Sequence, residues 1–189
     1  MEQLVLKGGN ALDIVHRIGS RTSLDVDLSL SQDFDDLERT RDKIFQALKS
    51  RFRSAGYSIF DEKLLCISSS ERPDPNDKWG GYVVEFKIIE QRRDELLRFD
   101  IARARREAVV VGPSQQRIFR VQVSKFEYCD GKQESDLDDY TIYVYTPAMI
   151  AIEKVRAICQ QMPEYPLRRN PVARAKDFYD IYSIVAEAG

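Results

Sequence analysis

Asp25 and Asp27 are separated by one residue, and this pair could hold a divalent cation if it lies on a β-strand. Residues two apart on a strand share a face, with roughly 6.5–7 Å between their Cα atoms. Carboxylates at this spacing can chelate a hard cation such as Mg²⁺, which also takes phosphate oxygens as ligands. The same Asp-x-Asp pattern occurs at residues 33–35 and 136–138, where helix capping or solvation of an acidic turn explains it. Asp25 and Asp27 are therefore our candidates for metal chemistry.

The segment 24–30 predicts the strand that this pair requires. Leucine or valine occupies every second position from 24 to 30, and Asp25 and Asp27 fall on the opposite face. In a half-buried strand, two like charges raise each other's pKa unless a cation is bound.

Lys7-Gly8-Gly9-Asn10 is a second pattern that could bind a ligand. Two glycines at a predicted strand-to-helix junction let backbone amides approach a ligand closely. The helix that Asn10 would cap adds N–H groups and the positive end of its dipole. Together with the charge of Lys7, these groups could hold a triphosphate. A tight turn that carries an exposed lysine is the alternative that this pattern leaves open.

The elements that must position these residues follow from hydrophobic periodicity and turn residues. We predict strands at residues 4–6, 24–30, 57–60, 63–69, 82–89, 95–102, 117–128 and 140–145. We predict a first helix that starts after Asn10 and is closed by Gly19, and a second over residues 34–53 with Asp33 or Asp35 as its cap. A third helix is predicted from Thr146-Pro147 onward, and a fourth over about 173–187. Loops are predicted at 71–81 and at the acidic turn 130–139. The buried stripe predicted for the helix after Thr146 consists of Ala148, Ala151, Ile152, Val155, Ile158 and Cys159. One mixed sheet with flanking helices, an α+β fold, is the simplest packing of these elements.

Composition restricts the class of protein. The 189 residues carry a formal net charge of −2, which argues against a uniformly basic nucleic-acid-binding surface. No apolar run approaches the roughly 20 residues that a membrane helix needs, and the N-terminus lacks the features of a signal peptide. The three cysteines are far apart and predict reduced thiols, so we expect a cytoplasmic protein. A single histidine disfavours histidine-based catalysis. We expect a core domain at residues 1–145 and a C-terminal helical part at 146–189, packed on the same core.

Two N-terminal stretches together resemble a known family. Leu4–Leu12 and the run Arg21-x-Ser23-x-Asp25-x-Asp27-Leu28 are similar to the AbiEii/AbiGii toxin family of the polymerase-beta-like nucleotidyltransferase superfamily. The C-terminal segments 152–157 (IEKVRA) and 174–182 (RAKDFYDIY) also resemble family motifs, so the resemblance covers nearly the whole chain. Family members usually carry helices before the Lys-Gly-Gly motif, which predicts a short member or a trimmed chain.

The resemblance implies a nucleotidyltransferase fold and a set of site residues. Asp25 and Asp27 would bind Mg²⁺, with Mn²⁺ as a substitute, and a nucleoside triphosphate (NTP) would be the substrate. Lys7, Gly8 and Gly9 would hold the triphosphate, and Ser23 would hydrogen-bond a phosphate oxygen.

The superfamily also implies a third carboxylate on a neighbouring strand, for the metal and for catalysis. Asp100 is our preferred residue, and Glu85 competes with it. Lys154 would contact the triphosphate or the transition state, and a surface lysine is the alternative. Asp177 would act with it in catalysis, and an ion pair with Arg174 is the alternative. We expect Phe178, Tyr179 and Tyr182 to pack inside, rather than to stack on a base.

The partners that the resemblance implies are an acceptor and an antitoxin. The family would move a nucleoside monophosphate from an NTP to a hydroxyl of RNA such as tRNA, or of a protein, as the toxin of a toxin–antitoxin or phage-defence pair. An RNA track, or only a solvated face, is predicted at Arg92, Arg93, Arg98, Arg103, Arg105 and Arg106. A nucleotide-binding interaction module without turnover is the alternative function.

Overall fold

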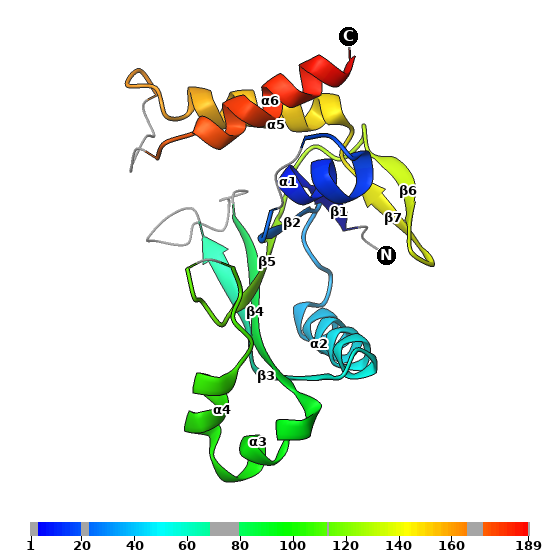
Figure 1. The fold of residues 1–189 in the computed structure, drawn as a ribbon. Coiled ribbons are helices and arrows are strands. Elements are labelled where there is room, and N and C mark those ends of the chain that lie inside the picture. The colour runs from blue at the N-terminus through cyan, green and yellow to red at the C-terminus, as the bar shows by residue number, and fades with distance from the viewer. Residues whose placement is uncertain (1–3, 20–22, 69–79, 113, 166–171, 189) are drawn as a thin grey trace. The chain divides into compact units, whose positions relative to one another are not determined.

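A computed structural model describes residues 4–19, 23–68, 80–112, 114–165 and 172–188 (Figure 1). The chain forms two compact units. The central unit is Leu30–Glu127, and the terminal unit combines residues 4–29 with 128–188. The C-terminal helical part predicted for residues 146–189 thus shares a unit with the N-terminal motifs. The predicted loop at 71–81 lies mostly outside the described residues.

The terminal unit places a parallel strand pair between two antiparallel ones. Its strands are β1 (Val5–Lys7), β2 (Val26–Ser29), β6 (Gln133–Leu137) and β7 (Tyr140–Val144). They pair in the order β2-β1-β7-β6, with β1 parallel to β7 and the other two pairs antiparallel. The chain runs from β1 directly into α1 (Gly8–Asn10) and the π-helix η1 (Ala11–His16). The mixed strand pattern with its helices confirms the α+β fold class.

Two C-terminal helices complete the core of the terminal unit. They are α5 (Pro147–Cys159) and α6 (Ala175–Ala188), which lie side by side in Figure 1. Ile150 of α5 and Ile184 of α6 are buried with Val5, Leu12 and Val144 in one hydrophobic cluster. The start of α5 is as predicted: Thr146 caps it by accepting a hydrogen bond from the Met149 amide, and Pro147 follows.

The central unit is an antiparallel sheet with helices. Its strands pair in the order β3 (Tyr57–Ser68), β4 (Gly80–Glu90) and β5 (Phe119–Ser124). The amphipathic helix α2 (Leu37–Ser54) packs Phe45 against Ile59, Val84 and Phe86 of the sheet. The short helices η2 (Gln91–Arg93), α3 (Glu95–Phe99) and α4 (Ile101–Glu107) follow β4.

The predicted strand at 95–102 is wrong, because this segment forms α3 and the start of α4. Ala104 and Ala108 are fully buried at helical spacing, and Leu97 packs against the same cluster. Alanine and arginine favour helices, so local propensity and packing agree here. Phe99, whose alternation with Leu97 favoured a strand, is 85% exposed.

Other boundaries differ from the predictions in detail. The predicted strands 57–60 and 63–69 are one strand, β3, with an irregularity between Phe60 and Lys63. The acidic turn at 130–139 contains β6, which pairs with β7. The first helix starts at Gly8 rather than after Asn10, and it ends before Gly19, at His16.

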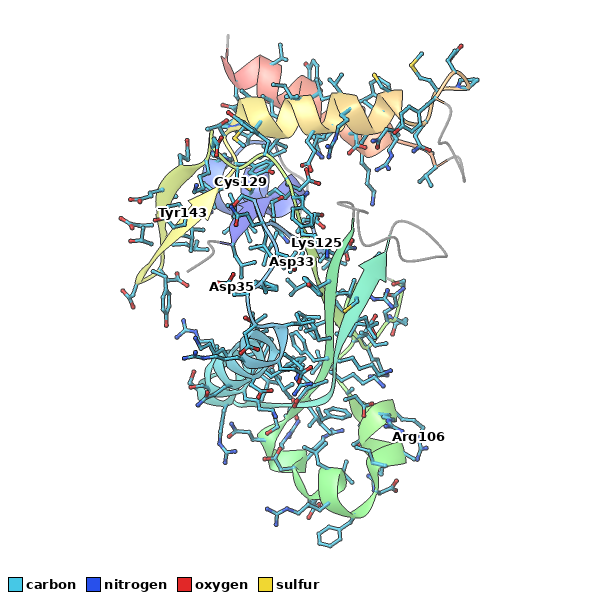
Figure 2. The ribbon with its side chains drawn as sticks, turned by 180° about the vertical axis from the view of Figure 1, so that it is seen from behind. Asp33, Asp35, Arg106, Lys125, Cys129 and Tyr143 are labelled. Carbon is cyan, nitrogen blue, oxygen red and sulfur yellow. The ribbon has the colours of Figure 1, made fainter. Side chains whose placement is uncertain are left out.

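Asp36 caps α2, so the prediction of Asp33 or Asp35 as its cap is wrong. Asp33 instead accepts hydrogen bonds from Lys125 at 2.7 Å and from the Tyr82 hydroxyl at 2.5 Å, and Figure 2 shows it beside Lys125. Burial raises the pKa of Asp33, but these hydrogen bonds and one from the Phe34 amide lower it by more. The net effect is a lowered pKa, so these contacts favour the ionised form of Asp33.

The structure describes the state of the cysteines and the lengths of the helices. The cysteines Cys66, Cys129 and Cys159 are free thiols, as expected. Among the described residues, no helix combines the length and the apolar character needed to cross a bilayer.

Candidate functional site

Lys7 and Asp27 lie opposite each other in the terminal unit. The register of the antiparallel pair β1/β2 sets Lys7 against Asp27, at the point where β1 ends. Lys7 is buried, with 7% of its surface exposed, so it is not the exposed turn lysine of the alternative interpretation. The two sequence motifs that first suggested chemistry are therefore brought together by strand pairing.

Gly8 brings the backbone of the glycine motif against the carboxylate of Asp27. Its φ of +68° is unfavourable for residues with a side chain. An added Cβ would lie 2.9 Å from the Asp27 Oδ2 atom, which is closer than side-chain carbons approach. Only glycine therefore allows this approach. Gly9 follows within α1, half-buried.

Asn10 fixes the other aspartate of the pair. Its side-chain Nδ2 donates a hydrogen bond of 2.6 Å to the backbone carbonyl of Asp25. Asn10 is buried inside α1 and does not cap a helix, so that prediction is wrong. Asp25 itself is exposed, just before β2 begins. The sequence signal for Asn10 was its place beside Gly9, but capping was the wrong role.

Burial raises the pKa of Asp27 from 3.8 to about 6. Lys7 and Lys154 oppose this rise, while the charges of Asp25 and Glu153 add to it. Asp25 is therefore close enough to repel Asp27 electrostatically. A carboxylate with this pKa is stabilised in its ionised form by an added cation.

Lys154 is the second cation of the site, and its position differs from the prediction. The helix α5 buries Ile150 and Lys154, whereas Ile152 is 70% exposed and Val155 is 48% exposed, so the predicted buried stripe is wrong. The Lys154 Nζ atom lies 2.6 Å from Asp180 Oδ2 and 3.2 Å from Asp177 Oδ1. Both acids belong to α6, which explains how a lysine can be buried on an apolar helix face.

Asp177 makes two ion pairs, and its predicted role in catalysis stays a prediction. It pairs with Lys154 and also lies 3.4 Å from the Arg174 guanidinium. Asp180, which sequence reasoning did not select as a site residue, is 4% exposed and makes the shorter contact to Lys154. Phe178, Tyr179 and Tyr182 of α6 are exposed, so the expectation that they pack inside is wrong.

Glu153 is, like Asp180, a residue of this site that was not predicted from the sequence. Its Oε1 atom accepts a hydrogen bond of 2.7 Å from Lys7 Nζ, which links α5 to the end of β1. The signal was its position directly before Lys154 in the IEKVRA segment.

The two candidates for the third carboxylate lie in the central unit, and each contacts an arginine of that unit. Asp100 is not on a strand: it caps α4 and accepts a hydrogen bond of 2.9 Å from the Arg103 amide. Glu85 is on β4, where its carboxylate lies 2.7 Å from Arg120. Within the ranges that the structure describes, no three His, Cys, Asp or Glu side chains are grouped to hold a metal ion. The roles of Asp100 and Glu85 stay predictions.

Ser23 lies in the described part just before Asp25 and is half-buried. Arg21 of the same motif lies outside the described residues. The predicted phosphate contact of Ser23 stays a prediction.

The arginine patch is largely paired with acids of its own unit. Arg92 pairs with Glu90, Arg105 pairs with Asp61, and Arg93 and Arg103 share Glu107. Of the six arginines, Arg98 and Arg106 have no acidic partner among the described residues, and Figure 2 shows Arg106 on α4. The interpretation as a solvated face gains support, and the RNA track stays a prediction.

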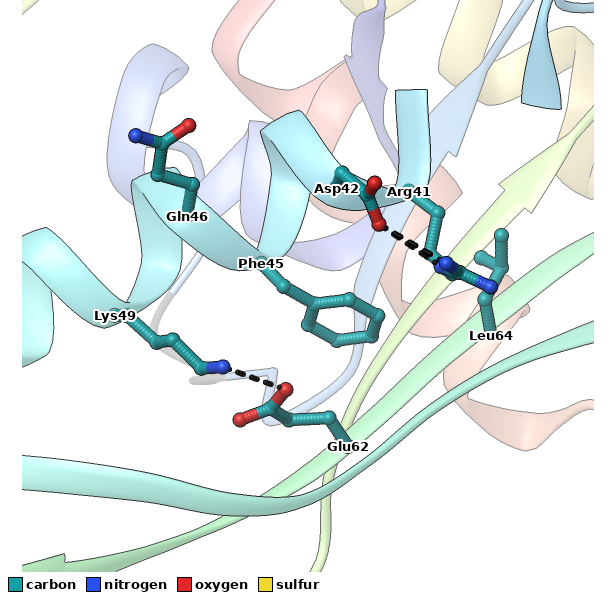
Figure 3. A pocket seen from close by; sticks show the side chains of 7 residues that line it. All are labelled: Arg41, Asp42, Phe45, Gln46, Lys49, Glu62 and Leu64. Carbon is teal, nitrogen blue, oxygen red and sulfur yellow. Dashed lines mark hydrogen bonds and ion pairs between the residues drawn. The ribbon is translucent and has the colours of Figure 1, made fainter. Parts of the chain in front are cut away.

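A pocket between α2 and β3 contains none of the predicted site residues (Figure 3). Its charged groups face one another, because Lys49 lies 3.0 Å from Glu62 and Arg41 lies 3.0 Å from Asp42. Phe45 forms part of the lining and belongs to the core of the central unit.

Comparison with known proteins identifies the family of the chain. The family model described as "Nucleotidyl transferase AbiEii toxin, Type IV TA system" matches residues 1–189, the whole chain. No curated protein matches the chain.

Proposed function

This chain belongs to the AbiEii family of nucleotidyl transferase toxins of type IV toxin–antitoxin systems, and we propose that it transfers a nucleoside monophosphate from an NTP with the help of Mg²⁺. The acceptor would be a hydroxyl of RNA such as tRNA, or of a protein. In this reaction the acceptor oxygen forms a bond to the α-phosphorus, the bond to the bridging oxygen breaks, and pyrophosphate leaves. The hydroxyl proton passes to solvent.

One observation carries the proposal: Gly8 meets the Asp27 carboxylate so closely that a Cβ would lie 2.9 Å from Oδ2. The amides of a phosphate-binding glycine motif and an acid suited to a metal are thus neighbours. Lys7, the residue before Gly8, lies opposite Asp27 in the β1/β2 strand pair. Nucleotidyl transfer from an NTP needs both kinds of group within reach of one ligand.

The charges of the site favour a requirement for a divalent cation. Lys7 is already paired with Glu153, and Lys154 is already paired with Asp177 and Asp180. A polyphosphate that approaches Asp25 and Asp27 therefore meets net negative charge unless a cation comes with it. These two carboxylates are the residues that would hold Mg²⁺, and the ion would neutralise charge that develops on the phosphate oxygens.

Each remaining residue has a role that its position supports. Lys7 and the backbone of Gly8 and Gly9 would bind the triphosphate, and Ser23 would hydrogen-bond a phosphate oxygen. Lys154, aligned by the acids of α6, would face the charge that develops on the phosphates. A cognate antitoxin partner follows from the family, whereas a role in phage defence and a cytoplasmic location stay predictions.

The proposal is tested by incubating the protein with α-phosphate-labelled NTPs, Mg²⁺ and a cell extract. We expect transfer of label to a macromolecule, lost with EDTA and in Asp25→Ala. The conservative control is Glu134→Gln, an exposed charge change on β6 of the same unit. Absence of transfer from all four NTPs would contradict the proposal. NTP binding that is insensitive to Mg²⁺ and to Asp27→Ala would instead favour a module without turnover.

A further inference from the structure

The contact between Glu153 and Lys7 joins residues 146 positions apart in the chain. The two side chains are 22% and 9% exposed, so water screens their 2.7 Å ion pair only partly. Glu153 sits on α5 directly before Lys154, while Lys7 ends β1 opposite Asp27. A carboxylate from the C-terminal part therefore reaches the lysine that would bind the triphosphate.

A triphosphate and Glu153 compete for the same ammonium. Phosphate oxygens that approach Lys7 must displace the carboxylate or accept its repulsion, since both are anions. Glu153 keeps a cationic neighbour after such a displacement, because the Arg156 guanidinium lies 3.8 Å from the same Oε1 atom.

We propose that Glu153 is a positioning residue that holds Lys7 in the nucleotide-free protein and yields it to the triphosphate on binding. This inference rests on the proposed function. Nucleotide binding then exchanges one anion for another at Lys7, and the negative charge of Glu153 weakens binding in the resting state. The same contact keeps a buried ammonium neutralised when no ligand is present.

Three variants separate the charge of Glu153 from its contact. Glu153→Gln keeps a carbonyl oxygen for Lys7 but removes the competing charge. Glu153→Asp keeps the charge but withdraws it by one methylene from Lys7. Glu134→Gln makes the same change of net charge on β6 and serves as the matched control. Thermal unfolding of each full-length variant verifies that it is folded.

The test is calorimetric titration of the full chain with inorganic triphosphate and Mg²⁺. We expect Glu153→Gln to bind about three- to tenfold more tightly than the wild type, which is the range of a partly screened ion pair. Glu153→Asp should tighten binding less, because its charge remains, and Glu134→Gln should leave it unchanged. The KM for NTP in transfer assays should fall by the same factor as the dissociation constant.

A merely structural role for Glu153 would lower stability and leave triphosphate affinity equal or weaker. Unchanged or weaker binding by folded Glu153→Gln, or equal tightening in Glu134→Gln, overturns the inference and leaves the proposed function standing. If Glu153→Gln does not fold, Glu153→Asp decides by the same measurement. A wild-type protein that binds no triphosphate, with or without Mg²⁺, overturns both.

Discussion

Asp27 is largely buried and lies near the negative charges of Asp25 and Glu153. The protonation of Asp27 leads to a first prediction, on the pH dependence of stability. Because the folded state raises its pKa from 3.8 to about 6, the folded state holds the proton more tightly than the unfolded state. The metal-free protein therefore loses stability as the pH rises from about 4 to about 6. Asp27→Asn cannot ionise, so in EDTA it should be more stable than the wild type above pH 6, by about 3 kcal/mol.

Urea denaturation of both proteins at pH 4 and pH 8 measures this difference. At pH 4 the two free energies of unfolding should be nearly equal. Mg²⁺ at pH 8 should stabilise the wild type and not Asp27→Asn, because the ion would compensate the charge that the variant lacks. Equal stability of the two proteins at pH 8 would contradict a raised pKa.

Gly8 allows a prediction with a matched control inside the chain. Gly56 also has a positive φ, +86°, but no atom lies within 4 Å of the place where its Cβ would be. Gly8→Ala and Gly56→Ala should each lose about 1 kcal/mol of stability from backbone strain. Only Gly8→Ala should also lose transfer activity, by about tenfold or more, because its methyl group displaces the Asp27 carboxylate. Equal activity of the two variants would show that the contact with Asp27 has no role.

At the scale of elements, α5 shows what a sequence pattern can and cannot predict. Thr146-Pro147 predicted the start of the helix, because a capping hydroxyl and an N-terminal proline act locally. Hydrophobicity did not predict which face is buried. That face carries Lys154, and its burial depends on Asp177 and Asp180, more than 20 residues later in the chain.

The pairing of α5 with α6 predicts a non-additive effect on stability. Lys154→Met removes the ammonium from beside Asp180, whose side chain is 6% exposed, and should cost about 3 kcal/mol. The double variant Lys154→Met/Asp180→Asn should recover part of this loss, because the most buried acid then carries no charge and Asp177 keeps Arg174 as a partner. Thermal unfolding compares the two. Additive losses would contradict coupling between the helices.

The segment 95–102 failed as a strand for a reason that its residues make plain. Leu97, Phe99 and Ile101 alternate, but the buried positions Ala104 and Ala108 continue a helical period that the shorter window did not include. Asp100 was selected on that predicted strand. Its observed place at the start of α4 gives it a capping function independent of any metal.

Asp100 can be tested without disturbing α4, because asparagine caps helices as well as aspartate does. Asp100→Asn should keep the stability of the wild type, whereas Asp100→Ala should lose about 1 kcal/mol. Urea denaturation measures both. The transfer activity of the stable Asp100→Asn variant then decides the open role: a strong loss assigns the carboxylate to the metal, and full activity leaves it as a cap.

At the scale of the whole molecule, the site is assembled from both ends of the sequence. Lys7 and Asp27 come from residues 4–29, and Glu153, Lys154 and Asp177 come from residues 128–188, yet all belong to the terminal unit. The motifs and the α+β class could be recognised from the sequence, because glycine, proline and alternating hydrophobic residues determine local structure. The contacts of Glu153 and Asp180 depend on tertiary packing, so they could not be read from local patterns.

Membership of a toxin family predicts an effect on growing cells. Expression of the wild-type chain without an antitoxin should arrest growth, and Asp25→Ala expressed to the same level should not. Colony counts after induction, with immunoblots to match the protein levels, measure this effect. Growth arrest by Asp25→Ala equal to that by the wild type would separate toxicity from the proposed site.

The central claim is that Asp25 and Asp27 hold a divalent ion beside a glycine motif that receives a triphosphate. A crystal structure with Mg²⁺ and a non-hydrolysable NTP analogue tests it most directly. We predict an ion coordinated by both carboxylates and by phosphate oxygens, with the triphosphate against the amides of Gly8 and Gly9. An analogue bound elsewhere, or an ion that contacts neither aspartate, would contradict the account.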